Sequence, residues 1–152
     1  MLIQLTTEQV NEAWEALKPA VKDSLPNRVA ENTTATTNIL TSALVGDCTF
    51  WGLYSKDEKG NELETGKLKG VVVTAVDREP VTKFKRLLVF SFWANNTSSR
   101  GEIVKGIETL EEYAEGENCA MIYALTENPQ LESMLETFGW NTNETLVYKP
   151  IK

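Results

Sequence analysis

The chain has 152 residues, of which 41% are hydrophobic and 24% are charged, and its formal net charge is −7. This length predicts one domain over residues 1–152 with a substantial core. The charge argues against nucleic-acid binding, because neutralising a phosphate backbone requires clustered lysines and arginines. An acidic surface instead attracts cationic partners such as amines.

The residue types exclude several kinds of chemistry. The sequence contains no histidine, so Ser-His-Asp and Cys-His catalysis are excluded, and Cys48 and Cys119 lack the further ligands of a structural zinc site. No apolar run is long enough to span a membrane, and residues 1–10 lack the basic and apolar regions of a signal peptide. We therefore expect a cytoplasmic protein with both cysteines free and buried.

The N-terminal third predicts two helices. Thr6 and Gln9 have the spacing of a capping box, so the first helix is expected to begin directly after Thr6. It should kink or restart at Pro19 and end at residues 25–27. Residues 32–47 predict the second helix. Its expected buried face consists of Ile39, Leu40, Ala43 and Leu44.

The middle of the chain predicts three consecutive strands. Residues 49–55 and 68–76 are rich in β-branched and aromatic side chains, and the polar residues 56–67 between them predict an exposed hairpin loop. Pro80 ends the second of these strands. Residues 86–93 are continuously apolar, which is typical of a central strand covered on both faces.

The C-terminal third alternates helix and strand. A helix that ends at Gly116 is followed by an apolar strand at 119–125, and residues 128–140 form a helix with Asn128 as N-cap. Residues 145–151 predict a closing edge strand. Because a helix joins 86–93 to 119–125, these strands should be parallel neighbours. A short strand at 2–5 is expected to precede all these elements. The sequence therefore predicts an α+β domain whose mixed, twisted sheet is flanked by helices.

This order of elements resembles the GCN5-related N-acetyltransferase (GNAT) fold, that is, the fold of acyl-CoA N-acyltransferases. The resemblance covers nearly the whole chain and is most specific in "LEEYAEGENCAMIYAL" at 110–125 and "NPQLESMLETFGW" at 128–140. The segments "ALVGDCTFWGLY" at 43–54 and "KGVVVTAVDREP" at 69–80 resemble the small acetyltransferase-like proteins of tailed bacteriophages. That narrower resemblance implies a location in a bacterial host cell or in the virion.

The resemblance implies acetyl-CoA as cofactor, with its pantetheine arm between two parallel strands and its pyrophosphate at the start of the following helix. Gly101 stands at the first glycine position of the family loop. Ser98 replaces a Gln or Arg, Glu102 adds a carboxylate, and Ile103 replaces a second small residue. The implied cofactor-binding residues are Phe92, Trp93, Ala94, Ser98, Ser99, Arg100, Gly101, Glu102 and Asn128.

The same loop also has a purely structural interpretation, in which Ser98 or Ser99 caps the helix, Glu102 complements its dipole and Ile103 joins the core. At the family's tyrosine position stands Leu135, which cannot donate a proton. The remaining candidates for proton transfer are the carboxylates Asp77 and Glu79 and the tyrosines Tyr123 and Tyr148.

Two functions remain open at this level. The chain is either an acetyl-CoA-dependent N-acetyltransferase that acts on an amine, or a non-catalytic phage accessory or virion-associated protein of the same fold that binds other proteins. Binding of CoA without chemistry is a third hypothesis. Whether the protein is an enzyme therefore has to be judged from the geometry of the candidate site.

Overall fold

The computed structural model describes residues 1–54, 68–95 and 98–151, so the predicted loop at 56–67 lies outside the described residues. The described strands form one five-stranded sheet in the order β1-β2-β3-β4-β5. Neighbouring strands are antiparallel except β4 and β5, which are parallel as predicted. The strands are β1 (Leu2–Gln4), β2 (Thr49–Tyr54), β3 (Leu68–Arg78), β4 (Lys85–Ala94) and β5 (Met121–Ala124).

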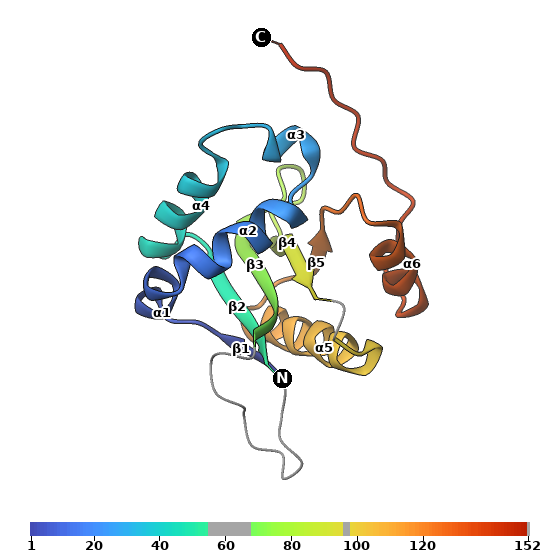
Figure 1. Ribbon diagram of the computed structural model, residues 1–152. Coiled ribbons are helices and arrows are strands. Elements are labelled where there is room, and N and C mark those ends of the chain that lie inside the picture. The colour runs from blue at the N-terminus through green and yellow to red at the C-terminus, as the bar shows by residue number, and fades with distance from the viewer. Residues whose placement is uncertain (55–67, 96–97, 152) are drawn as a thin grey trace.

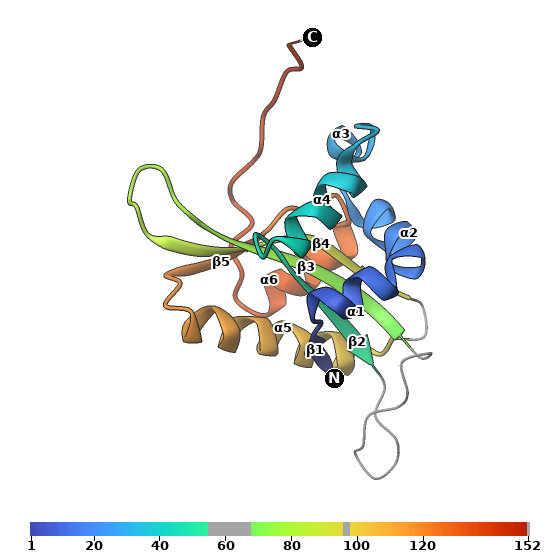
Figure 2. The ribbon, with the colours of Figure 1, turned by 90° about the vertical axis from the view of Figure 1, so that its left-hand side faces the viewer.

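The helices cover both faces of the sheet (Figures 1 and 2). One face carries α1 to α4 and buries a core that includes Phe50, Val71 and Val73. The other face carries α5, whose Leu110 packs with Trp51. The helices are α1 (Thr7–Glu12), α2 (Trp14–Ser24), α3 (Asn27–Ala30), α4 (Ala35–Leu44), α5 (Arg100–Gly116) and α6 (Pro129–Thr137). No helix in the described parts of the chain has the length and apolarity that a membrane crossing needs.

Side-chain caps set the starts of three helices. Thr6 and Gln9 form the predicted capping box of α1, and Ser99 and Glu102 form a second one at α5. Asn128 caps α6 by accepting hydrogen bonds from the amides of Gln130 and Leu131. Local sequence signals of this kind were sufficient to place these helix starts.

The predicted restart of the helix at Pro19 is wrong. The first helix is interrupted at Ala13, and Pro19 lies inside α2. A proline inside a helix costs about 3 kcal/mol. Leu17 and Val21 on either side of it are fully buried, and each such burial contributes about 1.5–3 kcal/mol. Packing against the sheet therefore outweighs the local cost.

Two predicted burials also need correction. Leu44 is 43% exposed, whereas Ala43 is buried as predicted and Ile39 and Leu40 pack, partly buried, against the core. Cys48 is buried, but Cys119 is only half-buried because it lies in the turn between α5 and β5. Burial raises the pKa of the Cys48 thiol to about 11, with a further contribution from the Asp47 carboxylate, so this thiol stays protonated at neutral pH.

The predicted closing strand at 145–151 is absent. Residues 141–151 are described and form neither helix nor strand. Gly139 has a left-handed backbone with φ of 86°, which turns the chain at the end of α6. The chain beyond Trp140 then runs away from the body of the molecule (Figure 1). A segment on this course cannot add to the sheet of its own chain, so its strand propensity is not realised.

Candidate functional site

The sheet opens between β4 and β5. The last paired residues are Val89 and Ala124, and the amide of Leu125 still donates to the carbonyl of Val89 at 3.1 Å. Beyond this point β4 continues to Ala94, whereas β5 has ended. A bulge in β4 at the same level leaves Phe90 without a partner in β3, because Val89 pairs with Thr74 and Ser91 pairs with Val73. The two strands therefore diverge along the second half of β4.

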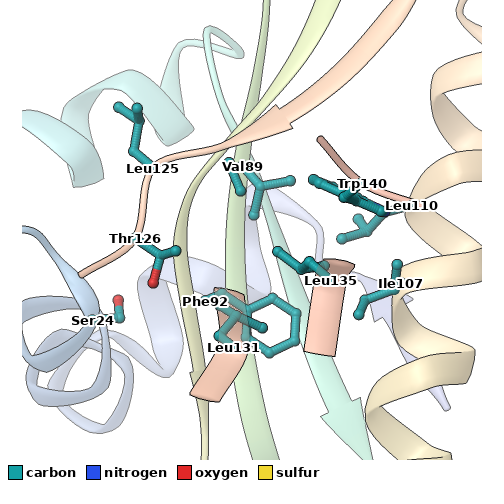
Figure 3. Close-up of a pocket in the computed structure, with 11 residues that line it drawn as sticks. Ser24, Val89, Phe92, Ile107, Leu110, Leu125, Thr126, Leu131, Leu135 and Trp140 are labelled. Carbon is teal, nitrogen blue, oxygen red and sulfur yellow. The ribbon is translucent and has the colours of Figure 1, made fainter. Parts of the chain in front are cut away.

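A cavity lies at this divergence (Figure 3). Its volume is about 20 Å³, which accommodates one water molecule. Its walls come from β4, from the chain after β5, from α2, from both C-terminal helices and from the residue Trp140. The lining residues include Val89, Phe92, Ile107, Leu131, Leu135 and Trp140.

Helix α6 closes the cavity from the side of α5. Leu131 and Leu135 are 7% and 6% exposed and pack with Ile107. Trp140 packs on the same cluster, and its Nε1 donates to the Glu111 carboxylate on α5 at 3.1 Å. Figure 3 shows Leu131, Leu135 and Phe92 grouped in the middle of the opening. Side chains of this chain thus occupy most of the space between the diverging strands.

The N-terminus of α5 lies beside the outer part of β4 and is capped by its own side chains. Ser99 Oγ accepts from the Glu102 amide, and Glu102 Oε1 accepts from the Ser99 amide, both at 3.1 Å. Ser98 Oγ donates to the carbonyl of Lys69 at 3.1 Å, which ties the loop to β3. The structural roles predicted for Ser99 and Glu102 are therefore present in the structure.

Lys69 compensates the charge of Glu102. Its Nζ donates to both carboxylate oxygens, at 3.1 and 3.2 Å. Partial burial pushes the pKa of Glu102 upward, but hydrogen bonds from the Ser99 amide and from Lys69 outweigh it, so this pKa lies below its usual value. A lone carboxylate at Glu102 would repel a pyrophosphate, and this repulsion is reduced because the pair with Lys69 is neutral.

The loop keeps open space at Gly101. A Cβ built on this glycine would have only Ser99 Oγ nearby, at 3.9 Å. Arg100 points toward α6, where its guanidinium donates to Thr137 Oγ1 at 3.4 Å and lies 5.9 Å from the centre of the Phe138 ring. Arg100 therefore does not lie over the helix N-terminus in this conformation.

The predicted cofactor residues occupy several places. Ser98 to Glu102 form one cluster at the α5 N-terminus, and Phe92 lies in the cavity. Trp93 packs in the core on the opposite face of the sheet. Ala94 is paired with Gly70 of β3, and Asn128 acts as the cap of α6. Ile103, which follows the Ser98 to Glu102 cluster in the first turn of α5, packs on the same apolar cluster as Phe92, whereas Trp93 belongs to a different layer.

Two of the predicted proton-transfer residues meet in one cluster. Arg86 Nε and Nη2 donate to the two oxygens of the Asp77 carboxylate at 2.6 and 3.2 Å, and its guanidinium lies 4.5 Å from the centre of the Tyr123 ring. The Tyr123 hydroxyl donates to Asp77 Oδ2 at 3.4 Å. Burial, with a contribution from Asp77, raises the pKa of the Tyr123 phenol, so it stays protonated at neutral pH. Tyr123 pairs with Leu88, one residue before the strands diverge.

Glu79 lies in the turn between β3 and β4. Its carboxylate accepts from the amides of Val81 and Thr82 and from the Thr82 hydroxyl. These bonds, those from Thr82 foremost, lower the pKa of Glu79. Because the turn precedes Lys85, it stands at the opposite end of β4 from the cleft. The geometry gives Glu79 a role in the turn.

Sequence reasoning missed three groups in and around the site. Lys69 belongs to no sequence motif that would indicate a binding role. Ser24 of α2 and the buried Ser91 of β4 join their hydroxyls across 2.5 Å beside the cavity. Trp140 was assigned to the end of a helix but lines the cavity. A polar residue inside an apolar strand, such as Ser91, was the one available signal, because buried polar groups need partners.

Ionisation of the Glu102 carboxylate should make the free energy of unfolding depend on pH. A lowered pKa means that the folded state favours the ionised form, so this contribution is present above the unfolded pKa of about 4.3 and is lost as pH falls through the folded pKa. We expect Glu102→Gln to lower the free energy of unfolding at pH 7 and to flatten its decline below about pH 4.3. Urea denaturation across this range measures both, and Glu115→Gln, an exposed carboxylate of the same helix, is the control. An unchanged acid decline in Glu102→Gln would contradict the pairing.

The fold is shared with known acetyltransferase structures. The chain superposes on a ribosomal-protein-alanine N-acetyltransferase from Brucella melitensis biovar Abortus 2308 with a TM-score of 0.66 and 15% identity, covering 99% of each chain. A predicted acetyltransferase from Clostridium acetobutylicum with acetyl-CoA gives 0.66 and 13%, over 98% of this chain and 95% of that one. Aminoglycoside N-acetyltransferase AAC(6')-Iy in complex with CoA gives 0.65 and 12%, over 100% and 99%.

These structures show that the chain has the GNAT fold that its sequence resembles, over its full length. No family model and no curated protein matches the chain. At such low identity the likeness concerns the fold, and what the site does has to be argued from its own residues.

Proposed function

We propose that the protein is an acetyl-CoA-dependent N-acetyltransferase that transfers an acetyl group to an amine. The observation that carries this proposal is the divergence of β4 from β5 over an apolar cavity, together with the α5 N-terminus, whose Ile103 packs on the apolar cluster of Ile107 and Phe92 at that cavity. This arrangement places an apolar slot and a set of helix amides next to each other. A ligand with an extended arm and an anionic group needs both.

The polar end of the cleft fits a pyrophosphate. The first turn of α5 begins at Arg100 and Gly101, where the helix amides and the helix dipole favour an anion. Gly101 leaves room for close approach, and Lys69 offers an ammonium beside Glu102. These residues would hold the cofactor's anionic end.

The apolar end fits the pantetheine arm only after a rearrangement. Its lining is apolar, but a space of about 20 Å³ admits one water molecule and no acyl chain. Leu131 and Leu135 fill the opening, so α6 has to move away from Ile107 for the arm to enter. We therefore expect cofactor binding to be coupled to a displacement of α6.

The acceptor is proposed to be an amine because the protein is acidic overall. Acetyl-CoA would supply the acetyl group as a thioester. Among the proposed proton-transfer residues, Asp77 and Tyr123 lie closer to the divergence of the strands than Glu79 does, and the Asp77 carboxylate would accept a proton through Tyr123 or a water. Ser24 and Ser91 offer hydroxyls on the α2 side of the cleft.

Titration with acetyl-CoA, followed by calorimetry and thermal shift, tests the proposal. We expect saturable stabilisation in the wild type. Gly101→Asp should weaken binding at least about tenfold, since it places a negative charge at the proposed pyrophosphate site. The same change should leave the fold intact, because an acidic residue is favourable in the first turn of a helix. Gly101→Asn has the same shape without the charge and is the matched control; equal affinities for the two variants would contradict the proposal.

A second candidate function is a non-catalytic module of this fold that binds other proteins. The observation that favours it is Leu135, which stands at the family's tyrosine position and is buried in the closed cleft. In this case acetyl-CoA produces no thermal shift at millimolar concentration, and acetyl transfer to a panel of amines is absent. A shift without transfer would indicate a CoA-binding protein.

A further inference from the structure

The cavity at the divergence of β4 and β5 has two hydroxyl groups in an otherwise apolar wall. They belong to Ser24 at the end of α2 and to Thr126, which follows β5. Figure 3 shows both on one side of the opening, with Leu135 on the other. The indole N–H of Trp140, which also lines the cavity, is already donated to Glu111. These two hydroxyls are therefore the lining groups that can give a proton to atoms placed in the cavity.

The tyrosines that the sequence offers for proton transfer are not among the residues that line the cavity. The Tyr123 hydroxyl donates to Asp77, on the sheet before the strands diverge. The Tyr148 ring lies 5.7 Å from the Arg28 guanidinium at α3. Leu135 does line the cavity, but its side chain has no exchangeable proton. A group that leaves from within the cavity thus depends on one of the two hydroxyls.

Ser24 is the hydroxyl that a second, buried hydroxyl supports. Its Oγ donates to the carbonyl oxygen of Val21 at 2.8 Å and lies 2.5 Å from Ser91 Oγ. A hydroxyl has one proton, and that of Ser24 goes to Val21, so Ser91 is the donor in the serine pair. Ser91 is 2% exposed and stands two residues after Val89, the last residue of β4 that pairs with β5. The pair holds the Ser24 oxygen where the strands diverge.

Ser24 is also held by elements that the cofactor arm does not have to displace. The serine pair joins α2 to β4, and α2 packs on the sheet through the fully buried Val21. Thr126 is tied to α6 instead, because its Oγ1 accepts from the amide of Asn128, the cap of that helix, at 3.0 Å. Since α6 has to move when the arm enters, Ser24 is the hydroxyl that keeps its position.

We propose that the Ser24 hydroxyl gives the proton to the sulfur that leaves when the acetyl group is transferred. This inference rests on the proposed function, in which Asp77 takes the first proton of the ammonium group. As the C–N bond forms and the C–S bond breaks, the sulfur keeps the electron pair of the broken bond. Ser24 turns its proton from Val21 to that sulfur and receives the second proton of the attacking nitrogen. The products are an amide and a thiol, and Ser24 is regenerated.

The hydrogen bond from Ser91 favours this step. It stabilises the negative charge that develops on the Ser24 oxygen while the proton leaves, and such a bond is stronger in a poorly solvated site than in water. The bond does not have to break when Ser24 turns its own proton into the cavity. Ser91 thus acts on the reaction through Ser24, as a positioning residue.

The thiol of bound CoA tests the proposal without any acceptor. A hydroxyl that donates to the sulfur favours the thiolate and lowers the pKa of that thiol. The thiolate absorbs in the ultraviolet, so a pH titration of the CoA complex measures this pKa, and S-methyl-CoA, which has no ionisable sulfur, is the blank. We expect the thiol pKa to be at least about one unit lower in the wild type than in the double variant Ser24→Ala/Ser91→Ala, that is, about tenfold in the acid dissociation constant.

The choice of variants separates the hydroxyl from general effects on the fold. The double variant removes both partners of a buried hydrogen bond, which is nearly neutral for stability, whereas Ser24→Ala alone leaves the Ser91 hydroxyl unsatisfied. Thr126→Val removes the other hydroxyl of the lining at constant shape and should titrate like the wild type. Ser91→Ala keeps the Ser24 hydroxyl and should raise the thiol pKa by less than the double variant does.

The possible results distinguish this inference from the proposed function. Equal thiol pKa values in the wild type and the double variant, or the full rise in Ser91→Ala or in Thr126→Val, would overturn the assignment to Ser24. Calorimetry then still detects CoA binding, and the proposed function is unaffected. A wild type that does not bind CoA at millimolar concentration overturns the proposed function and this inference together. Thermal melting verifies that every variant is folded.

Discussion

Gly70→Ala is expected to lower the free energy of unfolding by about 1–3 kcal/mol, in the range of overpacked cores. A Cβ at this position would lie 2.7 Å from the carbonyl oxygen of Trp93 and 3.2 Å from the Cβ of Leu53. The first of these neighbours is backbone, so β3 and β4 have to move apart. For a chain of this size, the melting temperature should fall by about 2–4 °C for each kcal/mol.

Gly116→Ala is the matched control for this substitution. Gly116 is the last residue of α5, and an added Cβ meets nothing within 4 Å. Alanine there is expected to stabilise the protein by about 0.5–1 kcal/mol, because it restricts the unfolded chain. Equal melting temperatures for Gly70→Ala and the wild type would show that the approach of β3 to β4 is looser than described.

Leu135→Ala is expected to have the largest combined effect. Removing a buried leucine side chain costs about 2–5 kcal/mol, because the lost burial adds to the cost of the cavity that remains. Leu135 lines the cleft cavity, so the same substitution enlarges the space between β4 and β5. Under the proposed function the variant should therefore be less stable and yet bind acetyl-CoA more tightly, because it no longer has to displace this side chain.

The control for Leu135→Ala separates the cleft from general destabilisation. Leu25→Ala removes an equally buried leucine, 6% exposed like Leu135, from the core on the other face of the sheet. Both variants should lose stability in urea denaturation, and only Leu135→Ala should gain affinity in calorimetry. If Leu25→Ala changes the affinity to the same extent, the closed cleft is not what limits binding.

Local sequence signals predicted the features that depend on neighbouring residues. The capping boxes at Thr6 and Ser99 and the cap at Asn128 depend on residues two or three positions apart. The parallel pair of β4 and β5 follows from a connecting helix and a rule of handedness. These features could be predicted because each is decided by a short stretch of sequence.

The candidate site was only partly predictable for the opposite reason. Lys69 and Glu102 are 33 residues apart, and nothing in either segment indicates that they meet. The closure of the cleft depends on how α6 packs against Ile107, which is a matter of tertiary fit. Trp93 packs in the core on the face opposite Phe92, because side chains alternate along β4.

The sequence by itself determined the order of the five described strands, the helix starts after Thr6, Ser99 and Asn128, and the acidic character of the protein, because these follow from composition, periodicity and neighbouring residues. Only the tertiary structure decided the neutralisation of Glu102, the helix that continues through Pro19 and the fate of residues 145–151. In each of these cases a local preference competes with contacts made by distant residues. The final segment has every local property of a strand, and it is unpaired because a strand requires a neighbour that its own fold does not place beside it.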